Sequence, residues 1–377
     1  MSSLYLHIPF CRSKCPYCDF YSQVGSAQQV ADYVALLMLD LQLLARSRPH
    51  SAPLRTVFFG GGTPSLLTAG QAGRLLRQIE HDFGIAADCE ISLEANPGSL
   101  DAERLGGYRA AGINRLSLGV QSLCDRQLKQ LGRGHTAEDA RRAVAQARAA
   151  GFDNLSLDLM FGRPGQTGGQ LTQELEGLLA LQPQHVSLYG LSYETGTPFA
   201  ARLQRGELSE ATEEEYAEQY LLLRRLLTTA GFEHYEISNF ARPGYRCKHN
   251  QVYWRRGSCL AAGCGAHSFD AAGWGERRAV PPDLERYRRC LAQGRDPSER
   301  LETFDRRGAM AETLYLALRT ADGVDAEAFA ATFGSAPEAV FPAAFAQLSD
   351  QLRRHGQRWR FQAKSWLLYD HLISRFL

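Results

Sequence analysis

The sequence contains no apolar run of the roughly 18 residues that a membrane-spanning helix requires. The closest candidate, residues 34–45, is interrupted by Asp40 and Gln42 and is typical of an amphipathic helix. The N-terminal residues MSSLYLHIPF also lack the basic and long apolar stretches of a signal peptide. We therefore expect a cytoplasmic protein without a membrane span.

The sequence also lacks an excess of charge of either sign. Its 42 Lys and Arg residues balance 41 Asp and Glu residues, which leaves a net charge of +1. This balance disfavours a polycation built to hold nucleic acid, so we expect no nucleic-acid partner, although it leaves a local basic patch open. With 44% hydrophobic and 22% charged residues, 377 residues can form two globular domains or one large α/β barrel with an appendage.

A third absence is that of GxGxxG after the first predicted strand, which disfavours a dinucleotide-binding fold. The first two thirds of the chain instead alternates strand-like and helix-like segments. Strands are predicted at residues 4–8, 55–59, 89–95, 115–120, 154–160 and 185–191, and helices at 28–46, 68–83, 101–111, 136–150, 168–181 and 212–230. This alternation predicts an α/β protein with a parallel sheet and crossover helices, either a barrel or an open doubly wound sheet.

Three of the nine cysteines are clustered, whereas the other six are scattered. Cys11, Cys15 and Cys18 form a C-x3-C-x2-C pattern directly after the first predicted strand. Three thiolates on one loop can ligate three irons of a [4Fe–4S] cube and leave the fourth iron open for a substrate or cofactor. The alternatives are a zinc site, which usually needs a fourth ligand, and three unrelated thiols in a turn.

This cysteine spacing resembles that of the radical S-adenosylmethionine (SAM) proteins. Within them the chain is most similar, over nearly its whole length, to the haem-chaperone branch of the oxygen-independent coproporphyrinogen III oxidase family. The resemblance implies a partial (β/α)6 barrel of the TIM-like type, a [4Fe–4S] cluster at its mouth, SAM on the open iron and a small helical C-terminal domain. It also implies a protein that binds haem and transfers it to apo-haem proteins, such as respiratory enzymes at the membrane surface.

The domain organisation expected from this resemblance has three parts. Residues 1–240 would form the partial barrel, and residues 241–295, irregular and rich in Gly, Cys, His and aromatics, would close the barrel region. Residues 296–377 would form the C-terminal domain, with helices at 305–318, 325–333 and 341–355, a hairpin strand at 359–368 and a last helix at 369–376.

One position departs from the oxidases of the family, which carry a further cysteine two residues after the third. Here that position is Phe20, as in the haem-chaperone branch. The departure points away from coproporphyrinogen oxidase activity, and whether the chain is an enzyme at all stays open. The alternative is an active radical SAM enzyme such as an oxygen-independent coproporphyrinogen III dehydrogenase. A radical SAM enzyme acting on RNA is disfavoured by the near-zero net charge.

Polar residues follow the predicted strands at positions where the family binds SAM. Gly61, Gly62 and Thr63 end the second strand and look like the glycine motif that meets the methionyl amino group, although a tight turn would also need glycine. Glu94 ends the next strand, at the edge of a parallel barrel where ligands bind.

Further SAM-binding candidates lie on the strands that follow. Gln121 ends the fourth strand, Arg133 could pair the SAM carboxylate through its guanidinium, and Asp158 suits the ribose hydroxyls. Tyr5 and Tyr17 flank the cysteines at family positions for SAM or cluster packing, with ordinary core aromatics as the alternative.

The stretch KHNQVYW contains the motif HNxxYW, at His249, Tyr253 and Trp254. Imidazole is a common haem ligand, tyrosine a rarer one, and Trp254 offers a flat apolar face. By themselves such residues more often form a packed loop, but the resemblance assigns this motif to haem binding. His267 and Cys247 are weaker candidates for the iron ligand. The sequence leaves open which atom ligates iron, whether SAM is cleaved and whether the chain dimerises.

Overall fold

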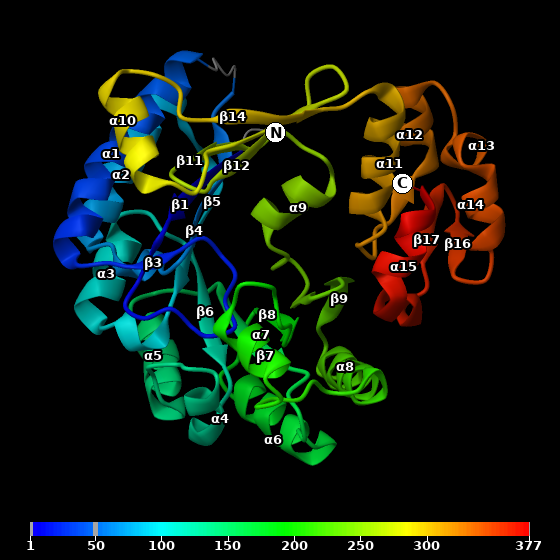
Figure 1. The fold of residues 1–377 in the computed structure, drawn as a ribbon, viewed down its shortest axis with the longest axis horizontal. Coiled ribbons are helices and arrows are strands. Elements are labelled where there is room, and N and C mark those ends of the chain that lie inside the picture. Colours follow the sequence, from blue (N-terminus) through cyan, green and yellow to red (C-terminus); the bar gives the residue numbers. More distant parts are fainter. Residues whose placement is uncertain (1–2, 48–51, 377) are drawn as a thin grey trace.

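The computed structural model describes residues 3–47 and 52–376, with a nine-stranded sheet as its largest element (Figure 1). Its six central strands are parallel: β1 (Ser3–Ile8), β4 (Leu54–Gly61), β5 (Ile85–Ala95), β6 (Arg115–Gln121), β7 (Leu155–Phe161) and β8 (His185–Gly190). At one edge β11 (Leu260–Ala262) is parallel to β1, and at the other β10 (Asn239–Ala241) and β9 (Glu233–Glu236) are antiparallel. The predicted partial (β/α)6 barrel is confirmed.

Helices connect these strands where the periodicity predicts them: α1 (Ala27–Ser47), α2 (Ala69–Phe83), α3 (Ala102–Ala110), α5 (Ala137–Ala149), α6 (Gly168–Leu179) and α8 (Glu213–Thr229). Four of them begin with a capping box in which a threonine and the side chain three residues later exchange hydrogen bonds with the backbone. Two short helices, α4 (Asp125–Gln130) and α7 (Pro198–Gln204), were not predicted. Shorter pieces between strands are β2 (Phe10–Cys11), β3 (Gln23–Val24) and the 3-10 turns η1 (Pro64–Leu66) and η2 (Pro97–Ser99).

Side chains of the central strands alternate between two environments, with Phe58 on β4 as an apolar residue on the mainly polar face. On β6, Leu116, Leu118 and Val120 are fully buried in the large hydrophobic core. The residues between them, such as Arg115 and Ser117, belong to the opposite face of the strand, since successive side chains point to opposite faces. The other central strands repeat this pattern, so the barrel interior is lined by polar side chains: Ser3, Tyr5, His7, Thr56, Glu90, Ser92, Glu94, Ser156, Asp158, His185 and Ser187.

A short helix, α9 (Lys248–Trp254), packs against the N-terminal ends of these strands. Glu90 on β5 accepts hydrogen bonds from the backbone nitrogens of Lys248 at 3.2 Å and His249 at 3.0 Å. His249 Nδ1 lies 2.8 Å from Thr56 Oγ1 on β4. The HNxxYW stretch, predicted to be irregular, is therefore helical, and it closes the base of the barrel.

A small antiparallel sheet and one helix lead from the barrel to the C-terminal domain. The strands β12 (His267–Asp270), β13 (Glu276–Ala279) and β14 (Glu299–Thr303) pair in this order, and α10 (Leu284–Ala292) lies between β13 and β14 in the chain. Figure 1 shows β14 running on to the C-terminal helices, with α9 between those helices and the large sheet.

The C-terminal domain has a second hydrophobic core, built from residues between Ala309 and Phe376. Its helices are α11 (Arg306–Ala317), α12 (Ala326–Phe333), α13 (Pro337–Val340), α14 (Pro342–Gln347) and α15 (Tyr369–Ile373), with 3-10 turns η3 (Ala363–Leu368) and η4 (Ser374–Phe376). The strands β15 (Val324–Asp325), β17 (Arg358–Phe361) and β16 (Leu352–His355) form a sheet in that order. The predicted domain limits at residues 240 and 295 stay predictions.

The helix predicted over residues 341–355 is wrong in its second half. It ends at Gln347, and Leu352–His355 is a strand that pairs with Arg358–Phe361 across a tight turn. Gly356 in that turn has φ +59°, a conformation that favours glycine and ends any helix. Among the described helices, none combines the length and the apolarity that crossing a bilayer requires.

The contact between Glu90 and α9 predicts a large and local stability effect. Glu90→Ala leaves the backbone N–H groups of Lys248 and of the buried His249 without their acceptor and removes a buried carboxylate near the buried Arg115, so we expect a loss of about 3–5 kcal/mol in unfolding free energy. Asp88→Ala, two residues earlier on the same strand, removes only an exposed pair with Arg55 and is expected to cost less than about 1 kcal/mol. Urea unfolding of both variants measures the difference, and equal losses would contradict it.

Candidate functional site

Cys11 ends β2, and Cys15 and Cys18 lie on the loop between β2 and β3, beside the C-terminal ends of the central strands. Cys11 is buried, Cys15 and Cys18 are half-buried, and all three are free thiols that line one cavity. Thr63 Oγ1 donates to Cys11 Sγ at 3.4 Å, and Arg133 Nη1 donates to Cys15 Sγ at 3.5 Å. A hydroxyl donor and a guanidinium therefore face two of the three sulfurs.

The arrangement of these thiols fits a cubane better than a zinc ion. No three His, Cys, Asp or Glu side chains in the described ranges converge closely enough to hold a single metal ion. A zinc site requires such convergence, with sulfurs about 2.3 Å from one atom. In a [4Fe–4S] cluster each thiolate binds a different iron, so the cysteines need only surround a common space.

The cavity has a volume of about 350 Å³ and opens at the C-terminal ends of β4 to β8. Strand ends of a parallel barrel are where ligands bind in this architecture. Besides the cysteines, the structure brings eight predicted SAM-binding residues to this cavity: Tyr17, Gly61, Gly62, Thr63, Glu94, Gln121, Arg133 and Asp158.

The glycines of the second strand end are required by the chain itself. Gly61 has φ +112°, and a Cβ atom there would lie 2.7 Å from the ring of His7. A Cβ atom on Gly62 would lie 2.7 Å from the carbonyl oxygen of Phe10, too close for a backbone contact. The tight packing of this loop against β1 and β2 therefore explains both glycines, and it places their backbone on the cavity wall.

Two carboxyl groups face the cavity from neighbouring parts of the sheet. Glu94 Oε2 accepts a hydrogen bond from Gly61 N at 3.2 Å, and Asp158 Oδ1 accepts one from Ser117 Oγ at 3.3 Å. Burial raises the pKa of Glu94 to about 8, helped by the charge of Asp158, and burial raises the pKa of Asp158 to about 6. Both acids therefore hold protons more tightly than in water until a ligand supplies hydrogen-bond donors.

Gln121 and Arg133 carry polar atoms without partners among the described residues. Gln121 Oε1 and Arg133 Nε are both buried and make no hydrogen bond. The rest of the Arg133 guanidinium is engaged, since Nη2 donates to Gly119 O at 2.8 Å and Nη1 points to Cys15. Unsatisfied buried polar atoms are rare in folded proteins, and here they fit a ligand with amino, carboxylate and hydroxyl groups, as SAM has.

Tyr17 packs beside these groups. It shares hydrogen bonds with Cys15 and Arg133, and burial raises its pKa, so it stays a neutral phenol. Its ring lies 6.2 Å from that of Phe199 on α7, one of the helices that the sequence did not predict.

Several cavity residues were missed by sequence reasoning. Tyr189, near the end of β8, is 46% exposed and faces the same cavity, as do Met160 and Ser192. The strand containing Tyr189 was predicted, and its end is the same kind of position that pointed to Glu94 and Gln121. Phe20 also lines the cavity and is 66% exposed, so its ring lies at the rim where the family's oxidases have a thiol.

The remaining predicted residues lie away from this cavity. The hydroxyl of Tyr5 lies 3.0 Å from His7 Nδ1, at hydrogen-bonding distance, and the Tyr5 ring stacks on Phe58 inside the barrel. His249 is 1% exposed, and its second ring nitrogen, Nε2, lies 2.8 Å from the hydroxyl of Tyr253. Thr56, its other partner, lies five residues before Gly61 on β4, which is about 17 Å of strand. Burial, with the nearby Arg115 charge, lowers the pKa of His249 to about 3, so the imidazole is neutral.

The weaker candidates are also separated from the cavity. Cys247 is buried and donates to Glu90 Oε1 at 3.6 Å, and His267 lies exposed at the start of β12. Trp254 lines a different cleft, between α9 and the C-terminal domain.

Comparison with known proteins agrees with this geometry. The model of the radical SAM superfamily matches residues 5–178, and that of the HemN C-terminal domain matches residues 304–368. The chain is 35% identical to the heme chaperone HemW of Bacillus subtilis, over 93% of this chain and 92% of that protein. It is 40% identical to the heme chaperone HemW of Synechocystis, over 86% of this chain and 79% of that protein. The chain belongs to the HemW family.

Membership in this radical SAM family implies a [4Fe–4S] cluster and SAM, which the donor set of the cavity fits. Among solved structures, coproporphyrinogen III oxidase (HemN) from Escherichia coli superposes with a TM-score of 0.86, covering 100% of this chain and 89% of that one. At 23% identity this likeness shows that this chain and the oxidase share a fold, and it shows nothing about activity.

The raised pKa of Glu94 predicts how the stability of the unliganded protein changes with pH. Because the folded state holds this proton up to about pH 8 and the unfolded state only to about pH 4.5, stability is lost as pH rises through that window. We expect the stability of Glu94→Gln to fall less between these pH values. At pH 8.5 its loss of melting temperature should be smaller than that of wild type by a few degrees, since 1 kcal/mol corresponds to on the order of 2–4 °C. Glu103→Gln, on exposed α3, is the control and should follow wild type. If the melting temperature of Glu94→Gln declined with pH as steeply as that of wild type, a group other than Glu94 would hold the proton.

Proposed function

We propose that this chain is a haem chaperone that binds haem and transfers it to apo-haem proteins, including respiratory enzymes at the membrane surface, while it carries a [4Fe–4S] cluster and SAM at the barrel mouth. The proposal is carried by one observation: the chain matches proteins named heme chaperone HemW at 33–40% identity over 86–100% of its length. The match includes the C-terminal domain, because two of these alignments cover at least 93% of the chain.

The residues at the barrel mouth have distinct tasks in this proposal. Cys11, Cys15 and Cys18 hold the cluster, and Thr63 and Arg133 donate hydrogen bonds to two of these sulfurs. Glu94, Gln121 and Asp158 accept hydrogen bonds from SAM, and Tyr17 closes the side of the cavity next to Cys15. When bound, the cluster would supply the electron for one-electron cleavage of SAM.

Two observations disfavour the alternative, an active oxidase of porphyrinogens. Phe20 puts an apolar ring at the rim position where the family's oxidases have a cysteine, and among the described residues only the three cluster cysteines contribute thiols to the cavity. The cavity volume of about 350 Å³ also lies at the small end of the roughly 300–1,000 Å³ that single small ligands occupy.

The test is one anaerobically reconstituted sample assayed twice. Titration with haem, followed by the Soret band, is expected to saturate at one haem per chain, and the bound haem is expected to move to an apo-globin added afterwards. The same sample is expected to leave coproporphyrinogen III unconsumed in the presence of SAM and a reductant.

Phe20→Cys is the matched control, because it restores the thiol of the oxidases at the barrel mouth without touching α9. Its haem binding should equal that of wild type. A wild type that binds no haem and decarboxylates the porphyrinogen would replace the chaperone function with the oxidase function.

A further inference from the structure

A second cavity, of about 680 Å³, lies between α9 and the C-terminal domain. Its walls come from α9, from the turn between β12 and β13, and from α11, α12 and β17. It is larger than the cavity at the barrel mouth and falls within the range of small-molecule sites. The cluster and SAM do not use it, since none of their predicted ligands lines it.

The motif HNxxYW is divided between the barrel and this cleft by the helical geometry of α9. His249 and Tyr253, four residues apart, share the face that contacts β4 and the barrel interior. Gln251, Trp254 and Arg255 lie on other faces and line the cleft. His249 therefore fixes the position of α9, whereas Trp254 and Arg255 meet whatever enters the cleft.

One side of the cleft is aromatic. Trp274, in the turn between β12 and β13, is 39% exposed and stacks on Phe333 of α12, with ring centroids 5.8 Å apart and planes inclined by 23°. Phe329 follows, 4.6 Å from Phe333. Trp254 lies opposite on α9, with the Arg319 guanidinium 4.9 Å from its ring. Such surfaces suit a flat apolar ring system.

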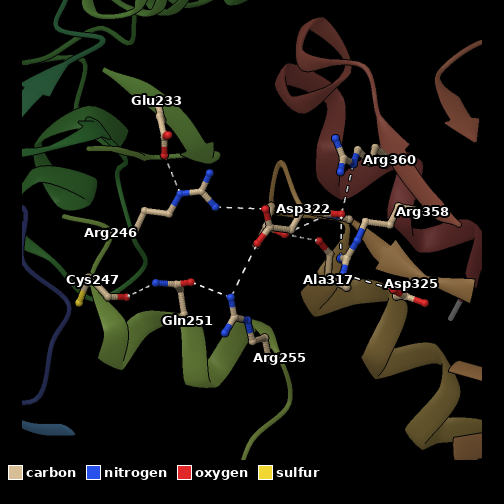
Figure 2. A network of polar contacts seen from close by, with 12 residues as sticks. Glu233, Arg246, Cys247, Gln251, Arg255, Ala317, Asp322, Asp325, Arg358 and Arg360 are labelled. Atoms are coloured by element: carbon tan, nitrogen blue, oxygen red, sulfur yellow. Dashed lines mark hydrogen bonds and ion pairs between the residues drawn. The ribbon is translucent and has the colours of Figure 1, made fainter. Parts of the chain in front are cut away.

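The other side of the cleft is built to hold carboxylates. Figure 2 shows Asp322 between arginines from both domains. Its carboxylate pairs with Arg246 Nη1 at 3.1 Å and Arg255 Nη2 at 3.8 Å on the α9 side, and its carbonyl oxygen accepts a hydrogen bond from Arg358 Nη1 at 3.3 Å. Arg358 on β17 pairs with Asp325 at 3.2 Å. Arg246 and Arg256 also pair with Glu233 and Glu312, which do not line the cleft, so all four arginines of the lining meet carboxylates. Arg255, at 3.8 Å from Asp322, has the longest of these contacts. Arginine binds carboxylates in paired hydrogen bonds, and an incoming carboxylate can share these donors.

We propose that this cleft is the site of the haem cargo, with the macrocycle against Trp274 and Phe333 and the propionates on the arginines around Asp322. The proposal rests on the proposed chaperone function and names its binding site. A flat apolar ring with two carboxylates is the ligand class that this pairing of aromatic and arginine walls recognises.

The cleft supplies no strong protein ligand to iron. Among its described lining residues there is no His, Cys or Met, and the hydroxyl of Tyr235 is taken up by His185 Nε2 at 2.7 Å. Haem in this cleft is held by its ring and propionates rather than by its iron. A site without an axial side chain releases haem to an acceptor that offers one, which is what a transfer protein requires.

The first test is haem affinity of two surface variants beside wild type. Trp274→Ala removes the exposed aromatic wall, and we expect haem binding to weaken roughly tenfold, with a Soret position unchanged from wild type. Leu301→Ala, an exposed apolar residue on β14 outside the cleft, is the matched control and should bind as wild type. Circular dichroism shows that each variant is folded.

The second test concerns the propionates. Arg255→Gln is expected to weaken haem binding about three- to tenfold, but to leave binding of haem dimethyl ester, which has no free carboxylate, unchanged. Arg353→Gln, another exposed arginine in a weak ion pair of the C-terminal domain, is the control and should alter neither.

The outcomes separate this inference from the function on which it rests. Absence of haem binding in wild type overturns the proposed function. Haem binding by wild type with unchanged affinity in both Trp274→Ala and Arg255→Gln overturns the cleft and leaves the function standing. A folded His249→Ala variant with a shifted Soret band and lost affinity would make His249 the iron ligand and would also overturn the cleft.

Discussion

The polar interior of the barrel is the constraint on which the rest of this structure depends. Six parallel strands bury their apolar faces against the helices, and the alternation of side chains then forces Thr, Ser, Glu, Asp, Arg and His to point inward. A buried polar lining must find hydrogen-bond partners or lose stability. The protein meets this demand differently at the two ends of the barrel, and the two ends thereby acquire different functions.

At the base, the partner is a piece of the chain itself. Helix α9 packs beside Glu90, Thr56 and Arg115. Cys247, the residue before the helix, makes no side-chain cap, and Glu90 supplies the missing hydrogen-bond acceptor at the helix N-terminus. At the mouth, Gln121 Oε1 and Arg133 Nε remain without partners in the described part of the chain, beside two acids whose pKa values are raised. Arg115 Nε at the base also lacks a partner, but α9 fills that end of the barrel, whereas the mouth opens into a cavity that fits a cofactor.

Much of the mouth could be predicted from the sequence, because its residues sit at the ends of strongly periodic strands. The spacing of Cys11, Cys15 and Cys18 and the polar residues Glu94, Gln121 and Asp158 are local signals whose meeting point follows from the parallel topology. The helix α9 could not be found in this way. Its own sequence has no N-cap, and the acceptor that stabilises it comes from Glu90, far away in the chain. The pairing of β16 with β17 was not predicted for a similar reason. Burial of Leu352 and Phe361 in the second core overrides the helical pattern of the sequence.

The same long-range packing explains why the role of the HNxxYW motif could not be predicted from its sequence. As a loop beside a haem, His249 would be an iron ligand; as the barrel-facing residue of α9, it is a neutral, buried group that fixes the helix on which Trp254 and Arg255 are presented. The C-terminal domain then completes a cleft instead of covering the barrel mouth. The haem site that we propose and the SAM site that we propose thus lie at opposite ends of one barrel, so that cargo and cofactor would not compete for space.

This separation is tested most directly by a distance between two paramagnetic centres in one molecule. Pulsed electron–electron double resonance between the reduced cluster and a bound copper-substituted protoporphyrin, whose metal keeps its unpaired electron, reports that distance. More than about 20 Å is expected, since about 17 Å of strand and the helix α9 lie between the two sites. A separation under about 12 Å, the reach of a single small cavity, would place the porphyrin in the barrel mouth and contradict a haem site beyond α9.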